Sequence, residues 1–349
     1  MFTTDLRPSF KRLGTILQPT GRPDAQERFL NPACTRLRDG SLQLYPRMVK
    51  PGNISSIGSF RARERSDGAL MLEPCGYVLE PEAPYELRDE PGGYGCEDPR
   101  VTYIAALDLY VMAYVAFGPR APEVALAVSD DGLTWKRIGL MHFGATAAPF
   151  SDKDAAFFPE PVRSPAGINS LALYHRPTIW DYTGSGVAPG TVAKGQVREE
   201  SISIGYISLD AVLHDVNKLC EVIETHHLKM PAATWGSVKV GAGTPPVRVR
   251  EGWLSVIHGV DWIERPGIPA YKRYCAGVIV HDVERLDRVV FRSPSPLFVP
   301  RAEGEVHGAT GHVVFPTAID QRPDANDRTF DIYYGLGDDE IGRGCLTLA

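Results

Sequence analysis

Short apolar runs, each about the length of one strand, recur along the whole chain and are separated by turn residues. The runs are rich in Val, Ile, Leu, Tyr and Phe, and Gly and Pro punctuate the stretches between them. The clearest runs are 41–45, 109–115, 124–128, 171–174, 202–206, 253–257, 277–280 and 330–334. This pattern predicts strands throughout the chain and an all-β fold, which can be a sandwich, a barrel or a propeller.

Helical periodicity is confined to one short segment that follows Ser208, a favourable N-cap residue. The apolar positions on its single face are Leu209, Val212, Leu213, Val216 and Leu219. We expect this helix to pack against the outside of a sheet.

Two features favour a propeller over the other all-β folds. A Ser-Asp-Gly turn recurs loosely at 66–68 and 129–132, and polar clusters recur at intervals of roughly one blade, about 40–50 residues. No linker or low-complexity segment divides the chain, so we expect residues 1–349 to form a single domain. The glycine-rich stretch 184–195 is interpreted as a surface loop.

Composition and charge narrow the classes of function. The chain has 349 residues, a formal net charge of -6 and no basic block, which argues against nucleic acid and anionic membrane as partners. No apolar run approaches the roughly 20 residues that span a bilayer, and the first residues lack the apolar core of a secretory signal. The six cysteines are scattered without a CxxC pair, which predicts reduced thiols, a cytoplasmic location and no metal site.

The most distinctive stretch is 92–100, Gly-Gly-Tyr-Gly-Cys-Glu-Asp-Pro-Arg. Its glycines free the backbone to turn, and Pro99 is expected to push Asp98 toward an extended conformation. Asp98 then begins a strand with Arg100 on the same face. A carboxylate held in this way suits acid–base chemistry, and it equally suits a structural ion pair with Arg100.

Polar residues stand at the ends of several other predicted strands. Each alone fits a structural role, but a propeller would bring such strand ends to one axial face. The resulting pocket would hold acids, aromatic rings and cations, and clustered cations suit phosphate. The acids and cations in question are Arg47, Asp98, Lys153, Arg176, Lys239, His258 and Asp338.

Six motifs, in this order, resemble glycoside hydrolase family 130. They are Gly95–Arg100, Lys153–Glu160, His175–Pro177, Gly241–Pro246, His258–Val260 and Tyr333–Gly335 followed by Asp338. The resemblance covers about Asn31 to Gly344 and implies a five-bladed β-propeller with a central pocket. It also implies an enzyme: most members are inverting phosphorylases that convert β-mannosides to α-mannose 1-phosphate, and a smaller set are β-mannosidases that use water.

The resemblance also implies a role for individual residues. Asp98 corresponds to the catalytic acid, which in some members protonates the leaving oxygen through the 3-hydroxyl of the mannose. The phosphate-binding positions correspond to Lys153, Arg176, Lys239 and His258. The positions expected to contact the sugar are Arg47, Asp338, Tyr334 and Arg100. One carboxylic acid is sufficient because phosphate arrives as an anion, whereas inverting hydrolysis requires a second carboxylate to activate water.

Two residues depart from the family pattern. Asp154 stands where many phosphorylases have asparagine, and Ile257 stands where many have tyrosine before His-Gly-Val. A β-mannosidase with Asp154 as its second carboxylate is therefore an alternative, and a propeller that only binds carbohydrate is another. The resemblance implies phosphate as co-substrate and no cofactor. Enzymes of the family often associate into homo-oligomers, but the sequence does not determine the oligomeric state of this chain.

Overall fold

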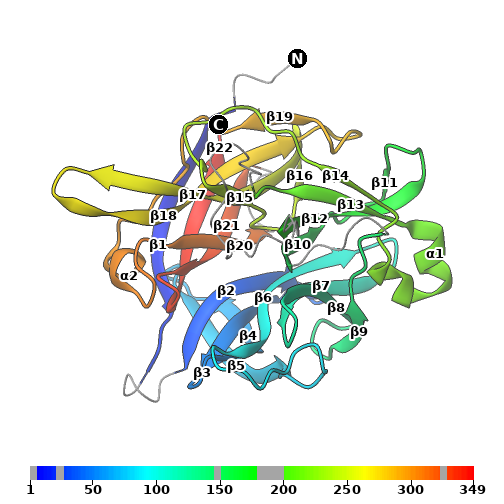
Figure 1. Ribbon diagram of the computed structural model, residues 1–349, viewed down its shortest axis with the longest axis horizontal. Helices are drawn as coiled ribbons and strands as arrows, with labels where there is room; N and C mark the ends of the chain where they lie inside the picture. Colours follow the sequence, from blue (N-terminus) through cyan, green and yellow to red (C-terminus); the bar gives the residue numbers. More distant parts are fainter. Residues whose placement is uncertain (1–5, 21–26, 145–150, 179–199, 323–327) are drawn as a thin grey trace, which may run out of the picture.

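The computed structural model describes residues 6–20, 27–144, 151–178, 200–322 and 328–349. Its regular structure is almost entirely β, in agreement with the predicted class (Figure 1). The strands form four sheets, whose neighbouring strands are antiparallel with one exception.

The largest sheet has eight strands in the order β2-β3-β4-β6-β7-β8-β9, with β5 paired to β4. Its strands are β2 (Arg28–Arg36), β3 (Leu42–Lys50), β4 (Ile54–Glu64), β5 (Leu70–Leu79), β6 (Tyr94–Ile104), β7 (Leu109–Phe117), β8 (Pro122–Ser129) and β9 (Lys136–Leu140). The exception is β4 and β6, which pair in parallel through only Ile54 with Tyr94 and Ser55 with Gly95. This sheet is therefore two antiparallel groups of four strands, β2–β5 and β6–β9, joined at one corner.

Two sheets have five strands and one has four. The first contains β10 (Ser151–Phe157), β11 (Val162–Arg163), β12 (Asn169–Thr178), β13 (Ser203–Ser208) and β14 (Glu224–His227). The second contains β15 (Lys239–Gly241), β16 (Val247–Val249), β17 (Gly252–Arg265), β18 (Ile268–His281) and β19 (Val289–Arg292). The last contains β20 (Val314–Gln321), β21 (Thr329–Leu336) and β22 (Glu340–Leu348), and β1 (Pro8–Leu17) from the start of the chain pairs with β22.

Helices are few and short in the described residues. They are α1 (Leu209–His214), the 3-10 helix η1 (Val216–Cys220) and α2 (Glu303–His307). The predicted N-cap is confirmed, because the Ser208 hydroxyl accepts a hydrogen bond of 3.3 Å from the Ala211 amide. None of the helices in these ranges is long and apolar enough to cross a membrane.

All eight apolar runs that the sequence singled out coincide with strands, except that Ser41 and Ile202 come one residue before β3 and β13. The main difference is length, because β17 and β18 each have 14 residues and form a long hairpin that projects from the body (Figure 1). The outer half of this hairpin is largely exposed and mixes apolar residues, such as Trp262 and Ile268, with charged residues, Pro and Gly, and the apolar runs in the sequence predicted only 253–257 and 277–280. The expected loop at 184–195 lies outside the described residues.

The buried apolar residues form five clusters, each between two neighbouring groups of strands. One cluster joins β2–β5 to β6–β9, for example through Tyr45 and Tyr114. The next three join each group to the following one in chain order. The fifth joins the last group to the first, through Tyr333 and Leu44 among others. The groups are therefore packed in a closed ring.

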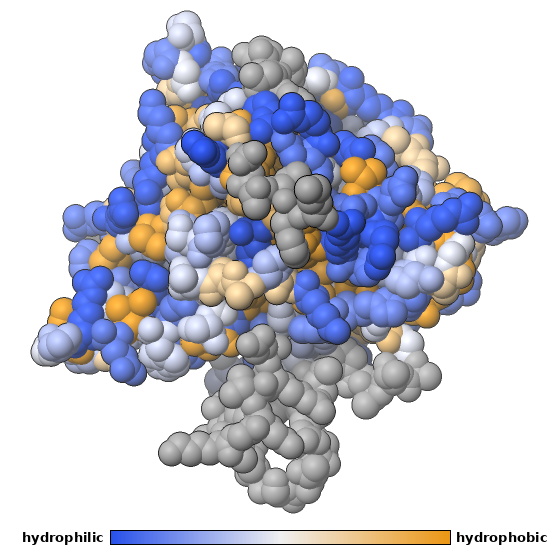
Figure 2. All heavy atoms as spheres, turned by 90° about the horizontal axis from the view of Figure 1, so that it is seen from above, coloured by the Kyte–Doolittle hydropathy of each residue, from blue (hydrophilic) through white to orange (hydrophobic). Residues whose placement is uncertain are grey.

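The first strands of the groups, β2, β6, β10, β15 and β20, converge near the middle of the molecule (Figure 1). The face seen in Figure 2 mixes hydrophilic side chains with scattered apolar ones. All six cysteines are free thiols, and Cys34, Cys96, Cys220 and Cys275 are buried.

Candidate active site

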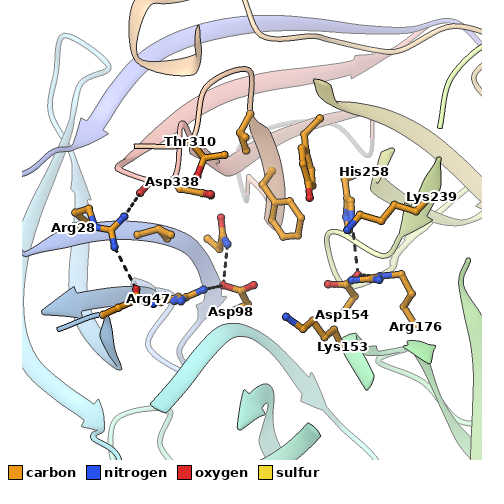
Figure 3. A pocket seen from close by; sticks show the side chains of 16 residues that line it. Arg28, Arg47, Asp98, Lys153, Asp154, Arg176, Lys239, His258, Thr310 and Asp338 are labelled. Atoms are coloured by element: carbon orange, nitrogen blue, oxygen red, sulfur yellow. Dashed lines mark hydrogen bonds and ion pairs between the residues drawn. The ribbon is translucent and has the colours of Figure 1, made fainter. Parts of the chain in front are cut away.

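A pocket of about 370 Å³ lies where these first strands meet, within the size range of small-molecule sites. Its walls come from all the sheets (Figure 3). The lining residues are Arg28, Leu30, Asn31, Arg47, Asn53, Asp98, Lys153, Asp154, Arg176, Lys239, His258, Tyr274, Thr310, Val313, Phe315 and Asp338. Seven of the nine site residues expected from the sequence are among them, and the exceptions are Arg100 and Tyr334.

β-Bulges shape the backbone of the pocket. Register shifts occur in β2 next to Asn31, in β6 next to Asp98 and in β10 next to Asp154. These three residues have φ angles of 38°, 47° and 58°, in the left-handed region. A bulge interrupts the alternation of side chains and turns one residue toward a new direction. The expectation that Asp98 is extended was therefore wrong, because the bulge overrides the influence of Pro99.

The carboxylate of Asp98 is held on one oxygen and free on the other. Its Oδ1 accepts hydrogen bonds of 2.8 Å from the Asn31 amide and 3.2 Å from the Arg47 guanidinium. Its Oδ2 makes no hydrogen bond within the described residues and lines the pocket. Asp98 is thus oriented firmly and keeps one oxygen available to a ligand.

The protonation of Asp98 reflects opposing influences. Burial alone would raise its pKa, but the Arg47 and Arg100 guanidinium groups and the Asn31 hydrogen bond lower the pKa below the usual value. Arg47 also donates a hydrogen bond of 2.7 Å to Glu97. Burial raises the pKa of Glu97, although the charge of Arg47 opposes this rise. The carboxylate of Asp98 is therefore ionised at neutral pH before a ligand binds.

A basic cluster, consisting of Lys153, Arg176, Lys239 and His258, lines the pocket on one side of Asp98 (Figure 3). Strand pairing explains why these residues meet. Lys153 in β10 is paired with Arg176 in β12. Lys239 in β15 is paired with Val260 in β17, and this places it two residues along from the neighbouring pair of Gly241 with His258. Residues about 100 positions apart in the chain thus share one wall.

His258 is the most unusual member of the basic cluster. It is 1% exposed, and neither ring nitrogen has a hydrogen-bond partner among the described residues. Burial lowers its pKa to about 3; Asp154 opposes this effect, whereas Arg176 and Lys239 add to it. The imidazole is neutral at pH 7 and has buried polar atoms that a ligand can satisfy.

Asp154 partly neutralises this side of the pocket. Its Oδ2 accepts a hydrogen bond of 2.6 Å from Nε of Arg176, and its Oδ1 accepts one of 3.4 Å from the Arg100 guanidinium. Burial would raise its pKa, but Arg176, His258 and Arg100 hold the pKa well below the usual value. Because Glu200 accepts a further 2.6 Å bond from Arg176, this guanidinium is fixed in place.

Two of the expected sugar contacts do not lie in the pocket. Tyr334 is buried in the apolar core, where its ring packs against Phe298 and its hydroxyl donates 3.2 Å to Glu305. Arg100 is 1% exposed and lies behind the pocket, donating 2.9 Å to the Asp98 carbonyl. The prediction from side-chain alternation failed for Arg100 because the bulge lies between it and Glu97.

Asp338 lies across the pocket from the basic cluster, in the turn between β21 and β22 (Figure 3). Its φ of 54° is also left-handed. Burial and the nearby Asp98 raise its pKa, although a hydrogen bond with Thr310 opposes the rise. Asp338 therefore contributes a carboxyl group whose proton is retained more readily than usual.

Several lining residues were not predicted from the sequence. Tyr274, opposite Val260 in β18, lies beside His258, and the Lys239 ammonium is 5.5 Å from the centre of its ring. Phe315 is 4.3 Å from the His258 ring. Ile257, where the family often has tyrosine, is buried in the core, so Tyr274 supplies a phenol to this wall instead. Tyr274 had no signal in the sequence, because it comes before the predicted strand 277–280 and reaches His258 only through the pairing of β18 with β17.

Comparisons with known proteins agree with the resemblance. Residues 7–348 match the family model of glycoside hydrolase family 130, described as beta-1,4-mannooligosaccharide phosphorylase. The chain is 26% identical to a 1,2-beta-oligomannan phosphorylase of Thermoanaerobacter sp. (strain X514), covering 89% of this chain and 87% of that protein. It is 29% identical to a beta-1,2-mannobiose phosphorylase of the same organism, covering 83% and 76%.

Solved structures show the same fold. The complex of Listeria innocua beta-1,2-mannobiose phosphorylase with beta-1,2-mannobiose superposes with a TM-score of 0.70. The match covers 97% of this chain and 96% of that chain at 20% sequence identity.

Proposed function

The chain belongs to glycoside hydrolase family 130, and from this membership we propose that it is an inverting phosphorylase that converts β-mannosides to α-mannose 1-phosphate. Relatives named for β-1,2-linked mannosides and a family description that names β-1,4-mannooligosaccharides make both linkages candidate substrates. The enzyme would take inorganic phosphate as co-substrate and no cofactor.

We propose further that residues 1–349 form one domain, a five-bladed β-propeller. The five groups of strands and the closed ring of apolar clusters between them support this blade count. The eight-stranded sheet counts as two blades because β4 and β6 share only a short parallel contact. Pairing of β1 with β22 would complete the last blade from both chain ends.

The basic cluster is the observation that carries the proposal. Two lysines, an arginine and a buried imidazole that has no hydrogen-bond partner among the described residues face one pocket, and Asp154 and Glu200 compensate only part of the positive charge. Charge-assisted hydrogen bonds from lysine and arginine suit phosphate, and Tyr274 adds a hydroxyl donor. We therefore assign phosphate binding to Lys153, Arg176, Lys239 and His258.

Asp98 is proposed as the acid, and Arg47 and Asp338 as contacts to the mannose. A phosphate oxygen attacks the anomeric carbon from the side of the basic cluster while the bond to the leaving sugar breaks on the side of Asp98. The leaving oxygen takes the proton of Asp98, directly or through a sugar hydroxyl. Because HPO₄²⁻ enters and a phosphate monoester dianion leaves, the phosphate proton restores the acid.

An anion in the basic cluster also explains how Asp98 acquires its proton. Arg47, Arg100 and Lys153 lower the pKa of Asp98 in the free protein. A bound phosphate dianion counters these positive charges and adds negative charge near the carboxylate, so the pKa of Asp98 rises. Binding of the nucleophile would thus prepare the acid.

Hydrolysis is the second candidate, because Asp154 places a further carboxylate in the pocket. Both of its oxygens accept hydrogen bonds from arginine, and its low pKa makes it a weak base toward water. In a phosphorylase, Asp154→Asn should keep activity within about tenfold, because an amide oxygen can still accept one of these bonds. A hydrolase that relies on Asp154 as base should lose about 100-fold or more.

The test of the proposed function is incubation with β-1,2- and β-1,4-mannobiose, each with and without phosphate. The proposal predicts α-mannose 1-phosphate and free mannose in equal amounts, and only when phosphate is present. Release of two mannose molecules at the same rate in both conditions would favour hydrolysis instead.

A further inference from the structure

On the wall of the pocket opposite the basic cluster, Arg28, Asn53 and Thr310 have no role assigned so far. This wall is made by the start of β2, the turn between β3 and β4, and the loops that hold Thr310 and Asp338. Figure 3 shows Arg28 on this wall, with Asp98 between it and Lys239 and Arg176. In a displacement with inversion, the nucleophile and the leaving group lie on opposite sides of the reacting carbon. If phosphate occupies the basic cluster, the leaving sugar must lie toward this wall.

Arg28 presents a guanidinium with spare donors on this wall. Its two hydrogen bonds to other described residues are long, 3.3 Å to the Asp338 carbonyl and 3.4 Å to Oδ1 of Asn53. Among the described residues, no carboxylate lies within ion-pair distance of Arg28, whereas Arg47 on the same side is paired with both Glu97 and Asp98. A guanidinium has five N–H donors, so Arg28 keeps several for a ligand.

Asn53 is built into the wall with a constrained backbone. It has a φ of 61°, and five of the seven non-glycine residues with positive φ in the described chain line this pocket. Its side-chain amide donates 3.0 Å to the Gly92 carbonyl. A Cβ at Gly93 would lie 2.3 Å from the Asn53 carbonyl oxygen, so the glycines of the Asp98 motif are fitted to this turn. Backbone strain of this kind concentrates at binding sites.

We propose that Arg28, together with Asn53 and Thr310, forms the subsite for the leaving sugar, which is the acceptor in the reverse reaction. The inference rests on the proposed phosphorolysis. The neutral oxygens and amide of this wall and the spare guanidinium donors match the hydroxyl groups of a neutral hexose. Arg28 is a specificity residue that holds the leaving sugar; the phosphate of mannose 1-phosphate binds to the basic cluster, and its mannose contacts Arg47 and Asp338.

The test is the reverse reaction, in which α-mannose 1-phosphate and mannose give β-mannobiose and phosphate. Arg28→Ala should raise the KM for mannose about tenfold or more and change the KM for α-mannose 1-phosphate less than about twofold. The KM for mannose of Arg28→Lys should lie between those of the wild-type protein and Arg28→Ala, because lysine keeps the charge but not the forked arrangement of donors. Lys239→Ala should raise the KM for α-mannose 1-phosphate and leave the KM for mannose nearly unchanged.

Arg120→Ala is the matched control, since this exposed arginine pairs with Glu123 on the surface, is not among the residues that line the pocket, and should change neither constant. An unchanged KM for mannose in Arg28→Ala, or an equal rise of both constants, would overturn the subsite while leaving phosphorolysis intact. Failure of the wild-type protein to release phosphate from α-mannose 1-phosphate with mannose would instead refute the proposed function, and the subsite with it.

Discussion

The proposed role of Asp98 requires its backbone conformation as well as its carboxyl group. Its left-handed φ of 47° and the adjoining bulge aim Oδ2 into the pocket, while Asn31 and Arg47 hold Oδ1. Aspartate and asparagine tolerate this region better than most residues. An amide can therefore replace the carboxyl group without disturbing the chain.

Asp98→Asn should lower kcat/KM for phosphorolysis by about 100- to 10,000-fold, the usual contribution of a general acid. The thermal unfolding midpoint should change little, because asparagine keeps the shape and the left-handed conformation. Kinetics with a β-mannobiose and phosphate, together with thermal melts, check both expectations.

Asp108→Asn provides the control for this substitution. Asp108 also has a left-handed φ, 53°, but it is exposed and contacts Arg38 and Tyr103 away from the pocket. Its replacement should leave kcat/KM unchanged. Equal losses in the two variants would show that the effect of Asp98→Asn is structural.

The limits of the sequence are clearest at single residues. Six motifs in order were sufficient to name Asp98 and the basic cluster, which the structure brings into one pocket. Arg100 and Tyr334 were misplaced because a bulge and a buried strand face decide where a side chain points, and neither has a clear local signature. Tyr274 was missed because its neighbour His258 is 16 positions away in the chain and meets it only through strand pairing.

At the scale of elements, the short strand β15 packs closely against the wall of the pocket that holds Asp154 and His258. Gly241 faces His258 across β15 and β17, and a Cβ at this position would lie 2.3 Å from both Oδ2 of Asp154 and Cε1 of His258. Contacts this short cannot persist, so any side chain here must displace part of the basic cluster. The glycine is required by close approach, since its φ is not in the positive range.

Gly241→Ala should raise the KM for phosphate about tenfold or more, because displacement of Asp154 or His258 disturbs charge-assisted hydrogen bonds to the anion. Gly205→Ala in β13 is a suitable comparison: its Cβ would meet Leu173 and Val222 at 3.2 Å in the apolar core. That variant should lose some stability and keep its KM for phosphate. Phosphate titrations and urea unfolding of both proteins separate the two effects, and an unchanged KM in Gly241→Ala would contradict this account.

The sequence predicted where most strands lie, but it did not predict how long they are. Apolar runs identified strands in every group because burial on a sheet face demands them. The outer half of the β17–β18 hairpin is exposed and mixes apolar residues, such as Trp262 and Ile268, with Glu, Arg, Pro and Gly, so no regular hydrophobic pattern indicated that the strands continue. The bulges were also invisible, because one extra residue in a strand changes register without changing composition.

At the scale of the whole molecule, the ring of five groups closes through pairs that are far apart in the chain. β1 pairs with β22, and Arg12 in β1 forms hydrogen bonds of 2.7 and 2.9 Å with the buried Glu305. Nothing in the apolar pattern predicts which strands close a ring. The closure was implied only by the resemblance, and the apolar clusters between all successive groups now support it.

Two buried histidines should make the stability of the whole molecule depend on pH. Burial lowers the pKa of His258 to about 3 and that of His281 to about 4, against about 6.5 in an unfolded chain. Between these values the unfolded state binds more protons, so the free energy of unfolding should fall as pH drops from 6.5 toward 4. Each histidine contributes up to about 1.4 kcal/mol per pH unit in this window.

Urea unfolding at pH 6.5, 5.5 and 4.5 measures this slope. His281→Gln should reduce it, because the buried imidazole that bonds Tyr174 and the Leu286 carbonyl is removed. The same change at His214, whose imidazole is exposed on α1, should leave the slope as it is. A slope that is the same in all three proteins would contradict the assignment of His281.

The central claim is that a phosphate oxygen becomes bonded to the anomeric carbon on the face opposite Asp98. The most direct measurement is the ¹³C NMR spectrum of the mannose product formed from a β-mannobiose and ¹⁸O-labelled phosphate. The account predicts α-mannose 1-phosphate whose C1 resonance carries the ¹⁸O isotope shift. Unlabelled free mannose as the sole product, formed at the same rate without phosphate, would contradict it.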